Sequence, residues 1–162
     1  MRMQGSMPSR KHICQGVYNQ TMPPLPDKAV PLDKFFRALA DPTRLRLLNL
    51  MSEQEICVCY FTEVIGAPQP KISRHLAYLR RAGIVAARRD GKWMHYRLTV
   101  PQDSYAASIL KSTMAALRTN KQMERDCARL TRACCGPKSL VQVLGAPLPS
   151  AVKTAGVFGS LS

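Results

Sequence analysis

The chain has 162 residues, of which 46% are apolar, so it is long enough for one hydrophobic core but short for two independent domains. Its 24 lysines and arginines outnumber 10 acidic residues, and the resulting formal charge of +14 favours a polyanionic partner such as nucleic acid. No apolar run approaches the roughly 20 residues that span a bilayer, and no signal peptide is apparent. We therefore expect no membrane association and a reducing cytoplasmic location, where the six cysteines favour free thiols, metal ligands or redox sensors over disulfides.

Three regions follow one another along the chain. Residues 1–30 mix polar residues with a proline-rich stretch, and we interpret them as a flexible N-terminal arm. Residues 31–131 carry the regular hydrophobic patterns of a folded domain. Residues 132–162 are small, weakly patterned and interrupted by proline and glycine, so we predict that this tail is mostly disordered.

The domain begins with three predicted helices. The first covers residues 31–40, where large apolar side chains recur at helical spacing. Asp41 followed by Pro42 begins the second, because aspartate caps a helix N-terminus and proline fits its first turn. The third is predicted over residues 55–65 and ends at Gly66, since glycine readily takes the left-handed conformation found at helix ends.

A fourth helix runs from Pro70 to Gly83, is basic on its outer face and forms a helix-turn-helix with the third. Two strands then surround Asp90 and Gly91, and we expect a tight hairpin turn with positive φ at both residues. In the second strand one set of alternating residues packs on the core, whereas the other set, which includes His95, meets solvent or DNA. The hairpin is the wing of a winged helix-turn-helix.

One long helix is predicted from about Asp103 to Thr131, because this stretch contains neither proline nor glycine. A helix that extends this far beyond a core usually packs against a partner. The predicted fold class is therefore mostly α with a small β-hairpin wing.

Eight basic residues and a single acidic one lie between positions 71 and 97. The N-terminal end of a recognition helix usually reaches base edges in the major groove, and the candidates there are Gln69, Lys71, Ser73, Arg74 and His75. Tyr78 lies one turn further on and is a candidate for contact with a backbone phosphate. Arg88, Arg89 and Lys92 of the wing are candidates for salt-dependent phosphate or minor-groove contacts. For His75 the alternative is packing between helices.

Cys57 and Cys59 are candidate ligands of a metal or metalloid. Residues i and i+2 of an ideal helix point about 200° apart, so both thiols can bind one ion only if the helix start is irregular or unwinds. Unwinding would displace the recognition helix and weaken DNA binding. Thiolates select soft ions, here As(III), Sb(III), Cd(II), Pb(II) or Zn(II), over magnesium or calcium. Without a ligand role, two helical cysteines are small buried hydrophobes.

With these elements in place, residues 32–98 strongly resemble the ArsR/SmtB family of metal-responsive repressors, and most of all its arsenic-sensing ArsR branch. The stretches that carry the resemblance are ALADPTRLRLL, the Cys-Val-Cys of EICVCYF, QPKISRHLAYLRRAGIV and DGKWMHYRL. The resemblance implies a winged-helix homodimer, joined through its terminal helices, that holds double-stranded operator DNA until As(III) or Sb(III) lowers its affinity.

The sequence departs from the family pattern at two sites. Thr62 stands where arsenic-sensing members have a third cysteine, so a third thiolate must come from elsewhere or the site has only two. Cys14 would resemble the cadmium- and lead-sensing CadC branch, and the adjacent Cys134 and Cys135 are the other candidates. A second family site, on the terminal helix, is predicted to be absent because Tyr105 replaces its first histidine.

Three other functions compete with metal-controlled repression. A thiol-redox repressor would oxidise one of the cysteine pairs instead of binding a metal. An arsenate reductase would need a cysteine and an arginine six positions apart in a phosphatase-like loop, which this sequence lacks, so we expect no enzymatic activity. A basic architectural DNA-binding protein would leave the Cys-Val-Cys unexplained.

Overall fold

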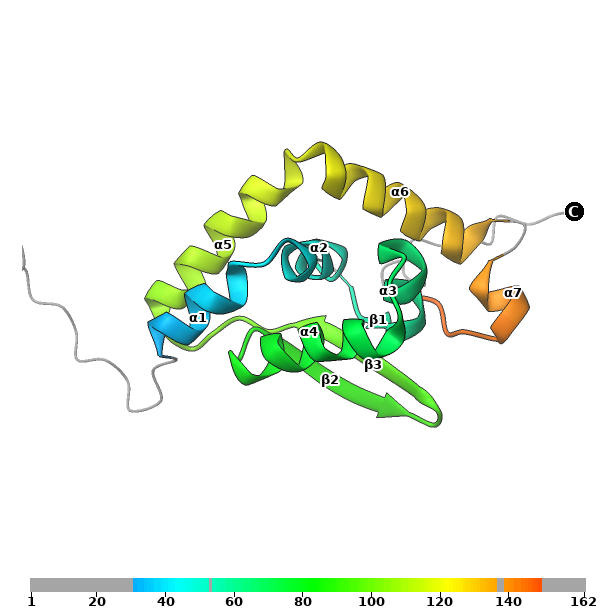
Figure 1. Ribbon diagram of the computed structural model, residues 1–162, viewed down its shortest axis with the longest axis horizontal. Helices are drawn as coiled ribbons and strands as arrows, with labels where there is room; N and C mark the ends of the chain where they lie inside the picture. Colours follow the sequence, from blue (N-terminus) through cyan, green and yellow to red (C-terminus); the bar gives the residue numbers. More distant parts are fainter. Residues whose placement is uncertain (1–30, 53, 137–138, 150–162) are drawn as a thin grey trace, which may run out of the picture.

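The computed structural model describes residues 31–52, 54–136 and 139–149 (Figure 1). Its helices are α1 (Leu32–Leu39), α2 (Pro42–Leu50), α3 (Val58–Ile65), α4 (Gln69–Arg81), α5 (Ser104–Arg118), α6 (Lys121–Cys135) and α7 (Leu140–Leu144). Its strands are β1 (Ile56–Cys57), β2 (Val85–Asp90) and β3 (Trp93–Leu98). The predicted fold class, mostly helical with a small hairpin wing, is confirmed. In the part of the chain that the structure describes, no helix is both long and apolar enough to cross a membrane.

Local capping signals fix the helices that lead into the helix-turn-helix. Asp41 is the N-cap of α2, where its carboxylate accepts a 2.9 Å hydrogen bond from the Arg44 backbone N–H, and Pro42 is the first helical residue. Gly66 follows α3 with a φ of +71°, the left-handed conformation expected there. Both sequence predictions are confirmed.

Helix α4 packs against α2, α3 and β2 through one apolar stripe. Ile72, Leu76 and Leu79 are fully buried on this stripe, as their spacing predicts, and each contributes roughly 1.5–3 kcal/mol by leaving water. The opposite face of α4, which carries the basic residues, is left outside the core. Burial of the stripe therefore determines which side of the recognition helix is presented to a partner.

The three strands form an antiparallel sheet in the order β1-β3-β2. Asp90 pairs with Trp93, so the hairpin loop consists of Gly91 and Lys92. Gly91 has a φ of +56°, and in the described chain only glycines have a positive φ. The expected turn with positive φ at Asp90 is therefore wrong by one position, and a glycine first in a two-residue loop has the φ sign of a type II′ turn.

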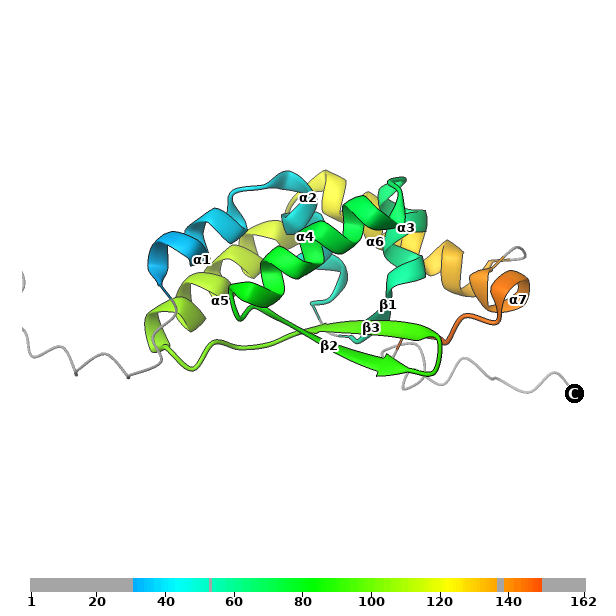
Figure 2. The same ribbon diagram turned by 60° about the horizontal axis from the view of Figure 1, so that its bottom comes forward.

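The predicted single helix from Asp103 to Thr131 is two helices. Asn120 separates α5 from α6 and caps α6, where its side chain accepts a 2.8 Å hydrogen bond from the Gln122 backbone N–H. This break changes the direction of the chain, so that α5 and α6 form an arch over the rest of the domain (Figures 1 and 2). As a result α6 packs against both α2 and α3.

A buried ion pair holds α6 in place. Two nitrogens of the Arg46 guanidinium donate to the two carboxylate oxygens of Asp126, at 2.6 and 2.8 Å. The Asp126 side chain is fully buried, and the Gln122 amide donates to it as well at 3.0 Å. The hydrogen bond to Asp126 raises the pKa of Arg46, whereas burial acts in the opposite direction. The pair therefore fastens α6 to α2 in one geometry.

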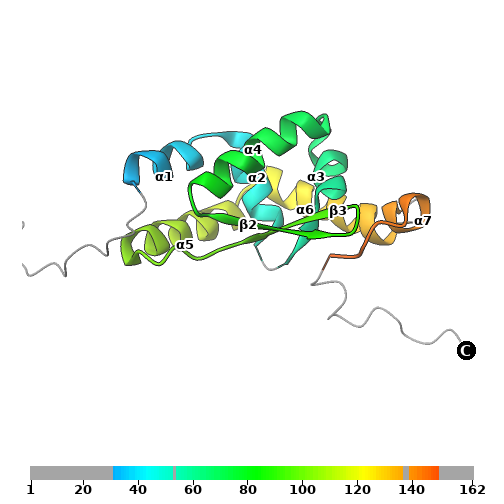
Figure 3. The ribbon, with the colours of Figure 1, turned by 90° about the horizontal axis from the view of Figure 1, so that it is seen from below.

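Part of the predicted disordered tail is ordered. Helix α6 continues to Cys135, and α7 follows with Ser139 as its N-cap and Gly145, at a φ of +65°, as its C-cap. Beyond α7 the chain returns toward the hairpin, and Pro147 and Leu148 line a pocket beside it. Figure 3 shows the hairpin tip and α7 at the same end of the molecule. Residues 150–162 and the arm of residues 1–30 lie outside the described chain.

Candidate DNA interface and thiol site

The five predicted base-reading residues all lie in the first two turns of α4, but they are not equally accessible. Gln69, Lys71 and Arg74 are exposed, whereas Ser73 and His75 are half-buried. Helix α4 begins with Pro68 as N-cap, without a side-chain cap, and with Pro70 in its first turn. The exposed trio is therefore the part of α4 that another molecule can reach without rearrangement.

His75 and Tyr78 are both tied to the beginning of α2. His75 Nδ1 lies 3.4 Å from the Asp41 carboxylate, and the His75 side chain is 17% exposed. The Arg44 guanidinium lies 4.4 Å from the Tyr78 ring centroid and donates a 2.7 Å hydrogen bond to the carbonyl of Ala38. His75 thus packs between helices, which is the alternative raised for it from the sequence. DNA contact by His75 or Tyr78 stays a prediction.

Each of the three cationic side chains predicted to contact DNA from the wing has a contact inside the protein. Arg89 donates to the Gly91 carbonyl at 3.0 Å, and the Lys92 ammonium lies 4.9 Å from the Trp93 ring centroid. Arg88 bonds to carboxylates on both sides of it, at 2.6 Å to Glu55 and 3.2 Å to Asp90. These ion pairs raise the pKa of Arg88, chiefly through Glu55. All three cations are exposed, and DNA contact by them stays a prediction.

His95 does not face solvent as the strand alternation predicts. Its side chain is buried, and its Nδ1 lies 3.6 Å from Glu55. Strand β1 pairs with the edge of β3 at His95, so that Glu55 next to β1 reaches the His95 side chain, and because β1 is only two residues long, no sequence pattern marks it. Sequence reasoning therefore missed both β1 and the role of Glu55, whose only signal is an acid placed two residues before a cysteine.

Cys57 and Cys59 lie at the junction of β1 and α3. The helix predicted from residue 55 in fact begins at Val58, and Cys57 is its N-cap in an extended conformation, with φ −69° and ψ 144°. Cys57 therefore lies outside the regular helix that contains Cys59, which is the irregular helix start that the i, i+2 spacing requires for both thiols to bind one ion.

The interaction between the two thiols changes their pKa values in opposite directions. The hydrogen bond from Cys59 lowers the pKa of Cys57 to about 7, against the opposing effect of burial. The same contact, with burial, raises the pKa of Cys59. A thiolate is therefore accessible at neutral pH at Cys57, and thiolate is the form that binds soft metals.

Among the other cysteines of the described chain, Cys134 is the buried one. It lies on α6, which packs on α3, and it is 3% exposed. Burial raises its pKa to about 12, although the nearby Tyr60 hydroxyl on α3 acts the other way. That hydroxyl is itself buried and makes no hydrogen bond of ordinary geometry within the described chain. Cys135 is exposed, and Cys14 lies outside the described residues.

The described residues bring two thiols together but not three. Within them, no group of three histidine, cysteine or acidic side chains is close enough to hold a metal ion. The donor set of Cys57 and Cys59 nevertheless fits a soft, thiophilic ion, and a third donor would have to approach by movement of a neighbouring element.

Comparison with known proteins gives the context for these sites. The family model described as bacterial regulatory protein, arsR family, matches residues 41–87. The arsenical resistance operon repressor of Escherichia coli is 47% identical over 78 residues, which are 48% of this chain and 67% of that protein. The arsenic resistance transcriptional regulator ArsR1 of Pseudomonas putida is 41% identical over 107 residues, which are 65% of this chain and 82% of that protein. The crystal structure of the repressor BigR from Xylella fastidiosa is 33% identical, with a TM-score of 0.44, over 52% of this chain and 84% of that one.

The fold and the exposed basic helix define a winged helix-turn-helix DNA-binding regulator with a thiol pair next to its DNA-binding unit. The sequence matches make the assignment specific: the chain belongs to the ArsR family of bacterial regulatory proteins. The resemblance noted in the sequence is thereby confirmed. Members of the family are transcriptional regulators and not enzymes, which agrees with the expectation of no enzymatic activity.

Proposed function

We propose that this chain is a homodimeric repressor that As(III) or Sb(III) releases from its operator by binding at Cys57 and Cys59. The observation that carries the proposal is the position of Cys57 as the extended N-cap of α3, outside the regular helix that contains Cys59, and the pKa of Cys57 is lowered by Cys59. Two relatives are named for arsenic resistance, which supports a metalloid inducer. The site lies on the first helix of the helix-turn-helix, so an occupant there can act on α4 directly.

The DNA interface consists of the first turns of α4 and the wing. Gln69, Lys71 and Arg74 are the primary base-reading residues because they are exposed, and Ser73 and His75 are secondary. Tyr78, Arg88, Arg89 and Lys92 supply contacts to phosphates. The net charge of +14 supports strong, salt-dependent binding through counterion release.

Replacement of Arg74 by alanine tests the DNA interface. We expect the variant to lose about 1–3 kcal/mol of operator binding, as for one bidentate base contact, and to keep its binding to unrelated duplex DNA nearly unchanged. Fluorescence anisotropy with both duplexes at several salt concentrations measures the two effects. Equal losses on both duplexes would assign Arg74 to a phosphate and remove it from the reading set.

A dimer formed through terminal helices is supported by exposed apolar side chains. Leu32 and Phe36 on α1 are 48% and 51% exposed, and Tyr105 on α5 is 41% exposed. Side chains of this size gain free energy when a second copy covers them. Two copies would also present two α4 helices to successive major grooves of an operator with two half-sites.

Cys134 is the proposed third ligand. It is buried on the helix that packs against α3, whereas Cys135 is exposed. Trivalent arsenic takes up to three thiolates, and Thr62 cannot provide one. If Cys14 is the third ligand instead, the alternative inducers Cd(II) and Pb(II) gain support, and Zn(II) at the thiols is a further possibility.

The test is release of a fluorescent operator duplex by sodium arsenite, with reduced protein under anaerobic conditions. We expect arsenite and antimonite to release the duplex at lower concentration than cadmium or lead. Release by cadmium with no response to arsenite would reverse this assignment. The lowered pKa of Cys57 also favours a second candidate, a thiol-redox repressor, which hydrogen peroxide would release and arsenite would not.

A further inference from the structure

The thiol site and the wing belong to one hydrogen-bonded ladder. Cys57 on β1 pairs with His95 on β3, and His95 pairs in turn with Arg88 on β2. Any displacement of β1 at Cys57 is therefore applied directly to the middle of the wing. The helix-turn-helix is thus not the sole element next to the sensing site.

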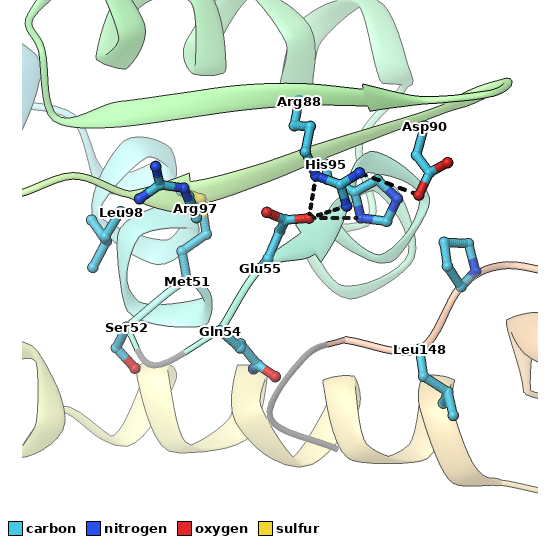
Figure 4. Close-up of a pocket in the computed structure, with 11 residues that line it drawn as sticks. Met51, Ser52, Gln54, Glu55, Arg88, Asp90, His95, Arg97, Leu98 and Leu148 are labelled. Carbon is cyan, nitrogen blue, oxygen red and sulfur yellow. Dashed lines mark hydrogen bonds and ion pairs between the residues drawn. The ribbon is translucent and has the colours of Figure 1, made fainter. Parts of the chain in front are cut away.

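Glu55 adds a side-chain link across the same three strands. One of its carboxylate oxygens accepts from Nε and Nη2 of Arg88, at 3.1 and 2.6 Å, and lies 3.6 Å from Nδ1 of His95 (Figure 4). Glu55 is 22% exposed, and it precedes Cys57 by two residues. A single acidic side chain from the sensing segment therefore holds both strands of the wing.

The surroundings of Glu55 leave room for this link to open. Glu55, Arg88 and His95 line a pocket of about 650 Å³, which Pro147 and Leu148 border on the other side. The Arg88 guanidinium also has a second partner within the wing, Asp90 at 3.2 Å. If the bond to Glu55 breaks, the Arg88 guanidinium can therefore turn into the pocket or keep its bond to Asp90. In neither case is it left in an apolar environment.

We propose that Glu55 is a positioning residue. It transmits ligand binding at Cys57 and Cys59 to the wing through its ion pair with Arg88 and its contact with His95. This inference rests on the proposed function and adds a second route beside the displacement of α4. A ligand that draws the two cysteine sulfurs together moves β1 and carries Glu55 with it. The wing then shifts relative to α4, so that both can no longer contact DNA at the same time.

The expected contribution of this route is partial. Arg88 is 55% exposed, and exposed ion pairs typically change an equilibrium by up to about fivefold. Coupling between two sites commonly amounts to about 5- to 150-fold in affinity. Loss of the Glu55 interactions should therefore lower the coupling between ligand binding and DNA affinity about threefold, and the coupling that is left is carried by α4.

The experiment compares Glu55→Gln with Asp90→Asn in the full-length protein. Both substitutions remove one negative charge beside Arg88, but only Glu55 connects it to the sensing segment. The readout is the operator dissociation constant with saturating sodium arsenite divided by the constant without it, so that changes in basal affinity cancel. We expect this ratio to fall about threefold in Glu55→Gln and to stay at the wild-type value in Asp90→Asn.

Two further variants separate the possible results. In an Arg88→Gln background, Glu55→Gln should cause a smaller additional loss than in the wild-type protein, because only the contact of Glu55 with His95 is left to remove. An unchanged ratio in Glu55→Gln, or an equal fall in Asp90→Asn, would overturn the role of Glu55. The Cys57→Ser, Cys59→Ser protein in the same assay reports on the proposed function separately, since arsenite must have no effect on it if the thiols are the sensing site.

Discussion

The Cys57→Ser, Cys59→Ser double variant is expected to bind the operator as tightly as the unmodified protein and to keep it when arsenite is added. The thiols lie at the start of α3, whereas the proposed DNA contacts are made by α4 and the wing. Moving a repressor from almost fully bound to almost fully free takes about 5.5 kcal/mol of differential ligand affinity, more than one thiolate can supply. Each single variant should therefore also respond weakly. Anisotropy with labelled operator, with and without arsenite, measures both quantities.

Matched variants on α6 locate the third ligand. Cys134→Ser should weaken the arsenite response, while Cys135→Ser, at the neighbouring exposed position, should leave it unchanged. Because Cys57 and Cys134 are buried, a serine hydroxyl costs about 1–3 kcal/mol of stability at either place, and thermal unfolding must confirm that each variant is folded. Normal release of the operator by the double variant of Cys57 and Cys59 would place sensing elsewhere in the chain.

The second large effect concerns stability, and it should be asymmetric across the Arg46 and Asp126 pair. Arg46→Ala leaves a fully buried carboxylate with its charge unpaired, so the free energy of unfolding should fall by about 3–5 kcal/mol. Asp126→Asn leaves an arginine that is 21% exposed and able to turn toward water, and the loss should be about 1–2 kcal/mol. Urea unfolding at one fixed protein concentration measures both, because dimerisation makes stability depend on concentration.

Arg125→Ala is the matched control for this pair. Arg125 is exposed on the same helix, and its replacement should change the free energy of unfolding by less than about 0.5 kcal/mol. Losses of equal size in Arg46→Ala and Asp126→Asn would show that burial of the carboxylate is not what sets the cost.

Interactions between neighbours in sequence made several elements predictable. The cap formed by Asp41 and Pro42, the left-handed Gly66 and the buried stripe of α4 follow from chemistry within a few residues of each other. Asn120 carried a similar cap signal that ends α5 and begins α6, but the absence of proline and glycine suggested an uninterrupted helix. The hairpin was placed correctly, and its turn was misplaced by one residue because Asp-Gly and Gly-Lys compete for the two central positions.

The winged helix-turn-helix class, the exposed basic face of α4 and the pair of cysteines beside it could be predicted from the sequence alone, since they depend on periodicity, charge and spacing along the chain. Contacts formed in the folded chain were needed to show that Cys57 lies outside α3, in an extended conformation. They were also needed to show that His95 is buried and that Glu55 holds Arg88. All three outcomes depend on β1, a two-residue strand that exists because β3 pairs with it from about forty residues away. Local propensity carries no information about such a pairing, because its hydrogen bonds form only when the folded chain brings the two segments together.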